Sequence, residues 1–331
     1  MDDAAFRRRY AALRALLNRR SRSLGWRGEP KDLRDGCSYV LGAGGKRVRS
    51  VLLVLSCEAV GGSAAEALDA GFAVEALHNF TLVHDDIMDH ASSRRGRPTV
   101  HMRWDTNTAL LVGDVLLGLA YRSLLGTRPG SPGPLARLMT GALLDVCEGQ
   151  ALDMEYERRN DVTIADYFRM IEKKTGRLIA AATEMGAVIG GGTPAQVRAL
   201  KGFGQHLGLA FQLQDDLLDV VASEHELGKP VGGDIVEGKK TFLLLTAAAR
   251  ARGKDRSLLG HVLRGTAPGM KRTVLVNHVT EIYRRHGVLE DAQHRILRET
   301  RSAVRMLGTI PPSEASAMLA WFAGALVHRA S

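Results

Sequence analysis

Two short segments of the sequence carry three aspartates at the same spacing within otherwise apolar runs. They are residues 82–89, which read LVHDDIMD, and residues 211–219, which read FQLQDDLLD. On a helix of roughly 3.6 residues per turn, the first and last aspartate of each set lie about 40° apart on one face. Ionised carboxylates at this spacing repel one another, and apolar surroundings raise the cost unless cations compensate the charge. The two segments therefore predict cation binding, and clustered oxygen ligands of this kind suit Mg²⁺.

Basic residues lie beside glycines in five other segments. They are GGKRVR at 44–49, RRG at 94–96, KKTG at 173–176, GKP at 228–230 and GKKT at 238–241. Arginine offers a planar fork to phosphate oxygens, and lysine offers a compact point charge. One such segment alone is typical of a solvated basic surface. Together with the two aspartate segments, they predict a site that binds diphosphates partly through metal ions and partly through basic side chains.

Helix signals recur along almost the whole chain and must position these groups. Capping boxes begin at Ser63 and at Thr163, and Pro194 follows Thr193 at a first helical position. Ser313 is predicted to precede the last helix. Between these signals, apolar residues recur at helical spacing, and strand signals are nearly absent. The sequence therefore predicts an all-α fold.

The length and composition of the chain limit its possible domain organisation. Its 331 residues are 45% hydrophobic and 24% charged, which is typical of a globular protein and excludes wholesale disorder. No long polar linker and no repeat interrupts it, so we expect a single helical domain over residues 1–331. The formal net charge is +9, but the basic residues are scattered and match no nucleic-acid-binding module.

The cysteines and the apolar stretches indicate in which cellular compartment the protein is expected. Cys37, Cys57 and Cys147 are odd in number and far apart, so neither a disulfide framework nor a cysteine-based zinc site is expected. A reduced, cytoplasmic compartment fits this usage best. The most apolar stretches are short or carry an acidic residue, so they are interpreted as buried helices, and no membrane span is predicted.

The motifs, taken in order, resemble the trans-isoprenyl diphosphate synthase (polyprenyl synthase) family. The segments that carry the resemblance are GGKRVR, HNFTLVHDDIMD, RRGRPTVH, EGQALD, KKTGRL, FQLQDDLLD and GKPVGGDIVEGKKT, from about residue 40 to 245. Among its members the chain is most similar to archaeal-type short-chain geranylgeranyl diphosphate synthases. The resemblance implies one isoprenoid-synthase domain, a helical bundle with a central active-site cavity. It also implies a homodimer.

The resemblance also implies a role for each matching residue. Three Mg²⁺ ions, which Mn²⁺ can replace, would be held by Asp85, Asp89 and Asp215, with Asp86, Asp216 and Asp219 in support. Isopentenyl diphosphate would bind to Lys46, Arg49, His78 and Arg95. The allylic diphosphate would bind to Arg94, Lys174, Thr175, Gln212, Lys229 and Lys239. Lys174, Thr175 and Gln212 would be catalytic, with Thr175 and Gln212 offering oxygen dipoles near the developing carbocation. Spacing independently places His78 two helical turns before Asp85, on the same face.

The implied reaction joins isopentenyl diphosphate head to tail (1'-4) to an allylic diphosphate of five, ten or fifteen carbons. Neutralising the diphosphate leaving group with Mg²⁺ and basic side chains breaks the allylic C–O bond, and the isopentenyl double bond then attacks the cation. Two alternatives are a class I terpene cyclase and a non-catalytic prenyl synthase subunit. A cyclase would have no use for GGKRVR, and silent subunits tend to lose the aspartate motifs.

In this family, the length of the prenyl product depends on the residues four and five positions before the first aspartate motif. Here these are Thr81 and Phe80. An aromatic at the fifth position with a small residue at the fourth resembles geranylgeranyl (C20) synthases. Farnesyl (C15) or longer products remain the alternatives. Helical periodicity alone does not place Phe80 in the pocket, since it lies roughly 140° from Asp85.

Overall fold

The computed structural model describes residues 3–23, 26–127, 132–222, 231–266 and 269–327. They divide into two compact units, and the chain passes between them several times. Unit 1 comprises residues 1–143, 178–201 and 307–321, and unit 2 comprises residues 144–177, 202–306 and 322–331. Each unit is described by itself.

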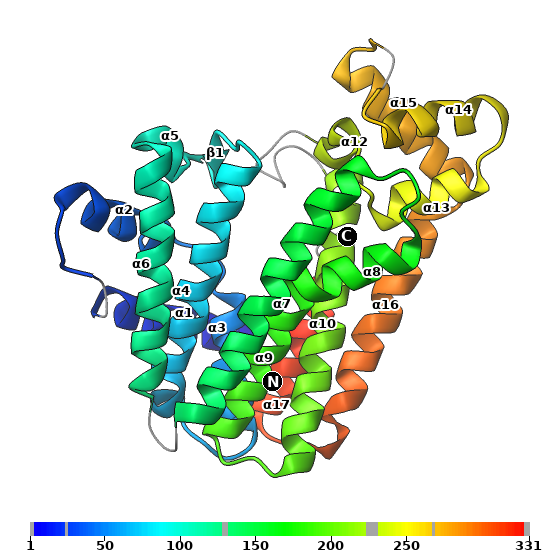
Figure 1. Ribbon diagram of the computed structural model, residues 1–331. Helices are drawn as coiled ribbons and strands as arrows, with labels where there is room; N and C mark the ends of the chain where they lie inside the picture. The colour runs from blue at the N-terminus through cyan, green and yellow to red at the C-terminus, as the bar shows by residue number, and fades with distance from the viewer. Residues whose placement is uncertain (1–2, 24–25, 128–131, 223–230, 267–268, 328–331) are drawn as a thin grey trace. The chain divides into compact units, whose positions relative to one another are not determined.

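Helices build nearly all of both units, so the predicted all-α fold is confirmed (Figure 1). In chain order, the first half contains α1 Asp3–Ser23, α2 Lys31–Leu41, α3 Val48–Ala59, α4 Ala64–Met88, β1 Ser93–Arg94, β2 Arg97–Pro98, α5 Val100–Arg103, α6 Thr106–Leu125 and α7 Pro132–Arg158. The second half contains α8 Ile164–Ile171, the π-helix η1 Glu172–Gly176, α9 Arg177–Ile189, α10 Pro194–Val221, α12 Gly233–Glu237, α13 Phe242–Arg250, α14 Gly253–Leu263, α15 Arg272–Arg285, α16 Val288–Met306, η2 Leu307–Thr309 and α17 Glu314–Val327.

The predicted helix starts agree with the structure. The predicted capping boxes form at Ser63 and Thr163. In each, the hydrogen bonds between the N-cap residue and the acidic residue three positions later are present. The helix α10 begins at Pro194, and α17 begins directly after Ser313. These positions could be predicted because a side chain that satisfies the first free N–H groups of a helix leaves a local signature.

Unit 1 is centred on α3, whose residues 50–57 are almost completely buried. An apolar sequence on every side of a helix is typical of such a central position. The long helix α4 packs against both α3 and α6, and Figure 1 shows α4 and α6 side by side. The first aspartate motif thus lies at the C-terminal end of a helix that is fixed along its length.

A two-stranded hairpin follows α4, which the sequence analysis did not predict. Ser93 pairs with Pro98 and Arg94 with Arg97. Arg95 and Gly96 form its two-residue turn with φ values of +54° and +71°. Positive φ at both turn positions is the geometry that matches the twist of a tight hairpin. In the sequence, the only local indication of this turn is the pair Arg95-Gly96, which stands between Arg94 and Arg97.

Unit 2 has its own core, built by the later helices. Tyr167, Leu213, Tyr283 and Ile296 are among its most buried members. The helix α13 packs against α8, α14, α15 and α16, and α12 packs against α14 and α15. This core supports the second aspartate motif on α10 and the segment that carries Lys239.

One apolar stretch is more exposed than predicted. The helix α6 is the single candidate, in the described part of the chain, that is long and apolar enough to cross a membrane, and only 44% of its apolar window is buried. Leu110, Leu111 and Leu125 are exposed on it. Every cysteine lies in the described residues as a free thiol, with Cys37 and Cys57 buried and Cys147 exposed.

Candidate active site

In unit 1, a glycine-rich loop between α2 and α3 presents the first group of predicted residues. Gly44 and Gly45 have φ values of +73° and +131°, which favour glycine, and α3 begins at Val48, three residues after Gly45. Lys46 is exposed on this loop, and Arg49 lies in the first turn of α3. Arg49 Nη1 lies 3.2 Å from Nε2 of His78 on α4. Two residues predicted to bind one diphosphate are thus in direct contact.

His78 is a neutral imidazole in this setting. Burial holds the pKa of His78 well below its usual range, and the positive charge of Arg49 and, to a smaller extent, of Arg95 lowers it further. Because a guanidinium can only donate, Nε2 accepts from Arg49 and the ring proton resides on Nδ1. His78 therefore orients Arg49 through a hydrogen bond instead of adding a positive charge, a distinction that spacing alone could not reveal.

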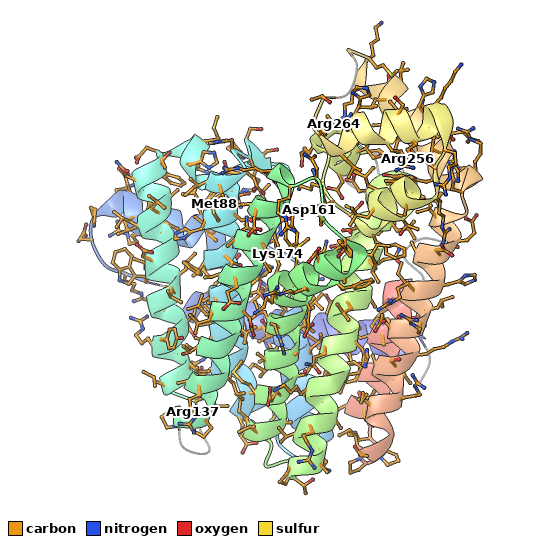
Figure 2. The ribbon with its side chains drawn as sticks, turned by 45° about the vertical axis from the view of Figure 1, so that its right-hand side comes forward. Met88, Arg137, Asp161, Lys174, Arg256 and Arg264 are labelled. Atoms are coloured by element: carbon orange, nitrogen blue, oxygen red, sulfur yellow. The ribbon has the colours of Figure 1, made fainter. Side chains whose placement is uncertain are left out.

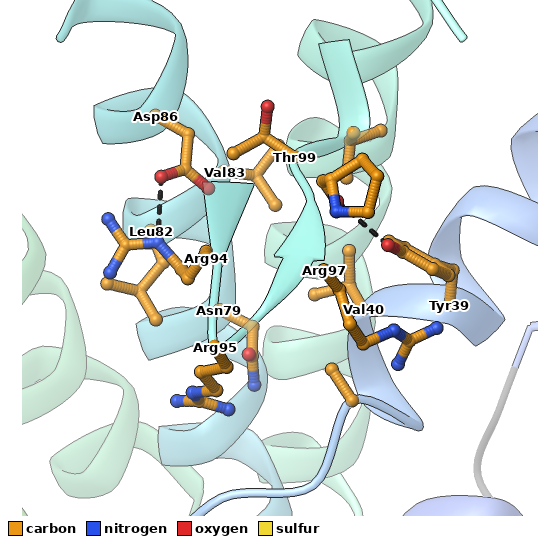
Figure 3. Close-up of a pocket in the computed structure, with 13 residues that line it drawn as sticks. Tyr39, Val40, Asn79, Leu82, Val83, Asp86, Arg94, Arg95, Arg97 and Thr99 are labelled. Carbon is orange, nitrogen blue, oxygen red and sulfur yellow. Dashed lines mark hydrogen bonds and ion pairs between the residues drawn. The ribbon is translucent and has the colours of Figure 1, made fainter. Parts of the chain in front are cut away.

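The first aspartate motif is joined to the hairpin by Arg94. Arg94 Nε donates to Oδ1 of Asp86 at 2.7 Å (Figure 3). Its Nη2 lies 3.7 Å from Oδ2 of Asp85. Burial raises the pKa of Asp86 above its usual value, and Arg94 opposes that rise. The guanidinium therefore compensates part of the charge of two adjacent carboxylates.

The last aspartate of this motif, Asp89, lies at the exposed end of α4. Met88, labelled in Figure 2, is the last helical residue, and Asp89 is the C-cap of the helix. The Asp89 amide still donates to the Asp85 carbonyl, so the two aspartates remain one turn apart, as predicted. Arg95, at the turn of the hairpin, donates through Nη1 to the carbonyl of Gly44 at 2.7 Å. Arg95 thus connects the hairpin to the glycine-rich loop.

The hairpin also covers a small cavity of about 50 Å³. Its lining includes Asn79, Leu82, Asp86 and both Arg94 and Arg95 (Figure 3). This volume is enough for very few water molecules. The cavity adjoins the predicted site without being large enough to be a substrate pocket itself.

The two residues predicted to set chain length lie on α4, one turn before the aspartates. The Phe80 ring packs edge-on against His84, with centroids 4.7 Å apart. Nε2 of His84 lies 3.2 Å from the Leu110 carbonyl of α6 and donates to it. The Thr81 hydroxyl donates to the His78 carbonyl at 2.8 Å. Phe80 is therefore held on the α6 side of α4, and its role in chain length stays a prediction.

A buried ion pair holds the base of the glycine-rich loop. Arg47 Nη1 donates to Oε1 of Glu75 at 2.7 Å, and both side chains are more than nine-tenths buried. The Ser50 hydroxyl donates to the other Glu75 oxygen, and Arg47 Nη2 donates to the Leu41 carbonyl. Sequence analysis missed Glu75, because a lone acidic residue in an apolar helix does not reveal its partner.

Breaking this pair should destabilise the protein strongly. Glu75→Gln leaves the buried Arg47 charge uncompensated, which typically costs about 3–5 kcal/mol. We therefore expect a clear fall in the midpoint of urea denaturation. Asp35→Asn, which breaks an exposed pair with Lys31, is the matched control and should leave the midpoint unchanged. Equal midpoints for the two variants would contradict the structural role of the pair.

In unit 2, Lys174 lies in the π-helical turn η1, between α8 and α9 (Figure 2). Its Nζ donates to Oδ2 of Asp153 on α7 at 2.6 Å. A Cβ on Gly149 would lie 2.3 Å from the Lys174 amide nitrogen, and one on Gly208 would lie 2.6 Å from the Gly176 Cα. Glycines therefore allow α7, η1 and α10 to approach closely. π-Turns of this kind are frequent at functional sites, and sequence periodicity predicted an ordinary helix here.

A chain of hydrogen bonds joins η1 to the second aspartate motif. The Thr175 hydroxyl donates to Oε1 of Gln212, and Gln212 Nε2 donates to Oδ1 of Asp216, each at 2.8 Å. The Tyr167 hydroxyl donates to the other Asp216 oxygen at 2.7 Å. Burial raises the pKa of Asp216 to about 6, although both donors oppose the rise. Asp216 is thus placed to hold Gln212 and Thr175 in position.

The outer members of the second motif differ in exposure. Asp215 is exposed, whereas Asp219 is buried beneath the segment that leads into α12. Oδ2 of Asp219 accepts from the Asp234 amide at 3.0 Å, and its carbonyl accepts from the Gly232 amide. Asp219 therefore fixes the start of α12, and Asp215 is the exposed member of the motif.

Lys239 follows α12 and lies beside acidic residues. Its Nζ is 3.1 Å from Oε2 of Glu237 and 3.9 Å from Oδ1 of Asp234. Burial lowers the pKa of Lys239, but these carboxylates outweigh burial and raise it above its usual value. A cavity of about 100 Å³ is lined by Asp153, Tyr167, Lys174, Thr175, Gln212, Asp216, Asp234 and Lys239, among others. Lys229 lies outside the described residues.

The carboxylates of the two aspartate motifs fit Mg²⁺ better than a metal ion whose ligands all come from the protein. In the described ranges, no group of three or more His, Cys, Asp or Glu side chains converges as a metal cluster. Structural zinc needs such a cluster, whereas Mg²⁺ binds through one or two carboxylates and completes its shell with waters and substrate phosphates. The exposed carboxylates of Asp89 and Asp215 and the partly buried carboxylate of Asp85 fit that requirement.

Known proteins resemble this chain over most of its length. The model of the polyprenyl synthetase family matches residues 30–280. A short chain isoprenyl diphosphate synthase of Methanothermobacter thermautotrophicus is 43% identical over 302 residues, 91% of each chain. A geranylfarnesyl diphosphate synthase of Natronomonas pharaonis is 36% identical, again over 91% of each. The crystal structure of geranylgeranyl pyrophosphate synthetase from Pyrococcus horikoshii superposes with a TM-score of 0.89 at 33% identity, covering 97% of this chain and 99% of that one.

Proposed function

Because the chain belongs to the polyprenyl synthetase family, we propose that it is the prenyltransferase that condenses isopentenyl diphosphate with an allylic diphosphate, and that its product is geranylgeranyl diphosphate. The observation that carries this proposal is that each aspartate motif has basic side chains beside it in its own unit. Arg94 contacts Asp85 and Asp86 in unit 1, and Lys174 and Lys239 line one cavity with Asp216 in unit 2.

Substrate binding in unit 2 requires exchange of ion pairs. Lys174 is bonded to Asp153 and Lys239 to Glu237, so a diphosphate must compete with a carboxylate for each lysine. A diphosphate carries more charge than a single carboxylate, which favours the exchange. Both lysines then stabilise the negative charge that develops on the leaving group as the allylic C–O bond breaks.

Magnesium bound at each motif, by Asp85 and Asp89 in unit 1 and by Asp215 in unit 2, would neutralise further charge on the leaving diphosphate. The hydroxyl of Thr175 and the amide oxygen of Gln212 present dipoles that favour a nearby carbocation, and Asp216 fixes both groups. Lys46 and Arg49 hold isopentenyl diphosphate, whose double bond attacks the cation. The proton that is then lost passes to the released diphosphate.

The same proposal extends to the assembly and the compartment. Leu110 and Leu111 are exposed near the start of α6, and Leu125 is exposed at its last residue. Exposed apolar side chains on a globular protein can mark an interaction site, and we assign this helix to contact with a second copy of the chain. The homodimer accounts for the apolar character of α6, and the free thiols fit the cytoplasm.

The product identity is tested by incubating the wild-type protein with isopentenyl diphosphate, Mg²⁺ and dimethylallyl, geranyl or farnesyl diphosphate. Chromatography of the dephosphorylated products should show geranylgeraniol, the C20 alcohol, from each primer. A C15 or C25 alcohol as the main product would contradict the C20 proposal. A cyclic hydrocarbon would favour the terpene cyclase instead.

A further inference from the structure

The glycine-rich loop is held by donors from other elements at three consecutive carbonyls. The carbonyl of Gly44 accepts from Arg95 Nη1, and that of Gly45 accepts from Arg14 Nη2 at 3.0 Å. The next carbonyl, of Lys46, accepts from the Tyr10 hydroxyl. Two of these three donors belong to α1, far from the loop in sequence.

The donors of α1 share one face of the helix. Tyr10, Arg14 and Asn18 follow one another at steps of four residues, which places them in a row. Oδ1 of Asn18 accepts from Arg47 Nε at 3.1 Å. The row therefore contacts residues 45, 46 and 47 of the loop. The matched family region begins at residue 30, so α1 lies outside it.

The loop needs external support because its backbone is unfavourable. Arg47 has a φ of +51°, in the left-handed region that a non-glycine residue rarely adopts. Such a conformation persists only where the surroundings impose it. The contacts from α1 hold the two carbonyls that precede Arg47 and the Arg47 side chain itself, and Lys46 and Arg49 lie on either side of Arg47.

The helix α1 does not need the polar row in order to dock. Its neighbouring face is apolar, since Phe6, Leu13 and Leu17, which lie beside the row, are buried. These three side chains anchor α1 within unit 1, where it packs against α3 and α4. The polar row is therefore available to set the conformation of the loop.

We propose that Tyr10 and Arg14 are positioning residues for isopentenyl diphosphate binding, acting through the backbone of the loop that presents Lys46. The inference rests on the proposed function, because it takes Lys46 and Arg49 as the isopentenyl diphosphate ligands. Removing either donor frees a loop carbonyl and lets the loop leave the conformation that binding requires. The allylic diphosphate, which is assigned to other residues, is unaffected.

The test compares Tyr10→Phe and Arg14→Gln with two matched variants. Tyr10→Phe removes one hydroxyl without changing charge or ring volume. Arg14→Lys keeps a donor, and Arg8→Gln removes an exposed charge from the same helix. Titration calorimetry measures the dissociation constants of isopentenyl diphosphate and of geranyl diphosphate with Mg²⁺, and steady-state kinetics measures the two KM values.

Tyr10→Phe and Arg14→Gln should each weaken isopentenyl diphosphate binding by about three- to tenfold, the effect of one hydrogen bond. Geranyl diphosphate binding should not change, and Arg14→Lys and Arg8→Gln should resemble the wild type. Wild-type affinity in both test variants would overturn the inference. Equal losses for both substrates, with a lower melting temperature, would also overturn it in favour of a purely structural role.

The same experiment separates this inference from the proposed function. Wild-type protein that binds isopentenyl diphosphate but forms no product would contradict the proposed reaction, while the variant dissociation constants would still decide the role of α1. Wild-type protein that binds no isopentenyl diphosphate would overturn both.

Discussion

Replacement of Asp85 or Asp215 by alanine should lower kcat by roughly a thousandfold, which corresponds to about 4 kcal/mol of lost transition-state stabilisation. The reason is charge: each residue is proposed to hold Mg²⁺ against the leaving diphosphate, and metal ions contribute several kcal/mol of such stabilisation. Helical circular dichroism should be unchanged, because Asp215 is exposed and Asp85 lies near the end of α4. Initial rates of product formation at saturating substrates and Mg²⁺ provide the measurement.

The matched control is Asp32→Ala, which removes an exposed aspartate from the first turn of α2. It should keep wild-type kcat. If Asp85→Ala or Asp215→Ala also kept near wild-type turnover, the metal assignment of that motif would be wrong. A fall in the Asp85 variant alone would restrict the metal site to unit 1.

The second large effect is expected in product length. Phe80→Ala removes an aromatic ring from the α6 side of α4, where it packs on His84. If this ring stops the growing chain, its loss should extend the products beyond C20. Elongation is favourable wherever room exists, since each buried CH₂ contributes about 0.8 kcal/mol. Chromatography of the dephosphorylated products should show a longer alcohol as the main species.

Two companion variants make this result specific. Thr81→Phe adds bulk one residue nearer the aspartates and should shorten the products toward C15. Phe80→Tyr keeps the ring and should keep the C20 product. An unchanged C20 distribution in both Phe80→Ala and Thr81→Phe would show that chain growth stops elsewhere, while the synthase activity itself would remain supported.

Much of the site could be predicted because its signals are local in sequence. Asp85 and Asp89 occur one helical turn apart, and the structure keeps them so. The glycines around Lys46 imply a tight loop, and two of them have positive φ. Helix starts at Ser63 and Thr163 follow from side-chain capping of free N–H groups, which depends on a few adjacent residues.

The rest depends on partners that are distant in sequence. Asp153 and Tyr167 became visible as site residues only when the fold brought them to Lys174 and Asp216. The buried pair between Arg47 and Glu75 joins residues that are 28 positions apart. No periodicity predicts the π-turn at Lys174, because it arises where glycines let three helical segments pack closely.

The neutral state of His78 is a further example. Its position on the face of Asp85 follows from spacing, and as an isolated residue it would titrate near neutral pH. Burial and the positive charge of Arg49 lower its pKa, and both depend on the packing of α3 against α4. Sequence could therefore place this residue but not its protonation state.

The central claim is that the protein joins two diphosphate substrates, and one measurement tests it most directly. Diphosphate release from geranyl diphosphate with Mg²⁺ is followed in the presence and in the absence of isopentenyl diphosphate. Prenyl transfer predicts rapid release only when isopentenyl diphosphate is present, with one elongation step for each diphosphate released. Release at the same rate without isopentenyl diphosphate, or no release under either condition, would contradict the claim.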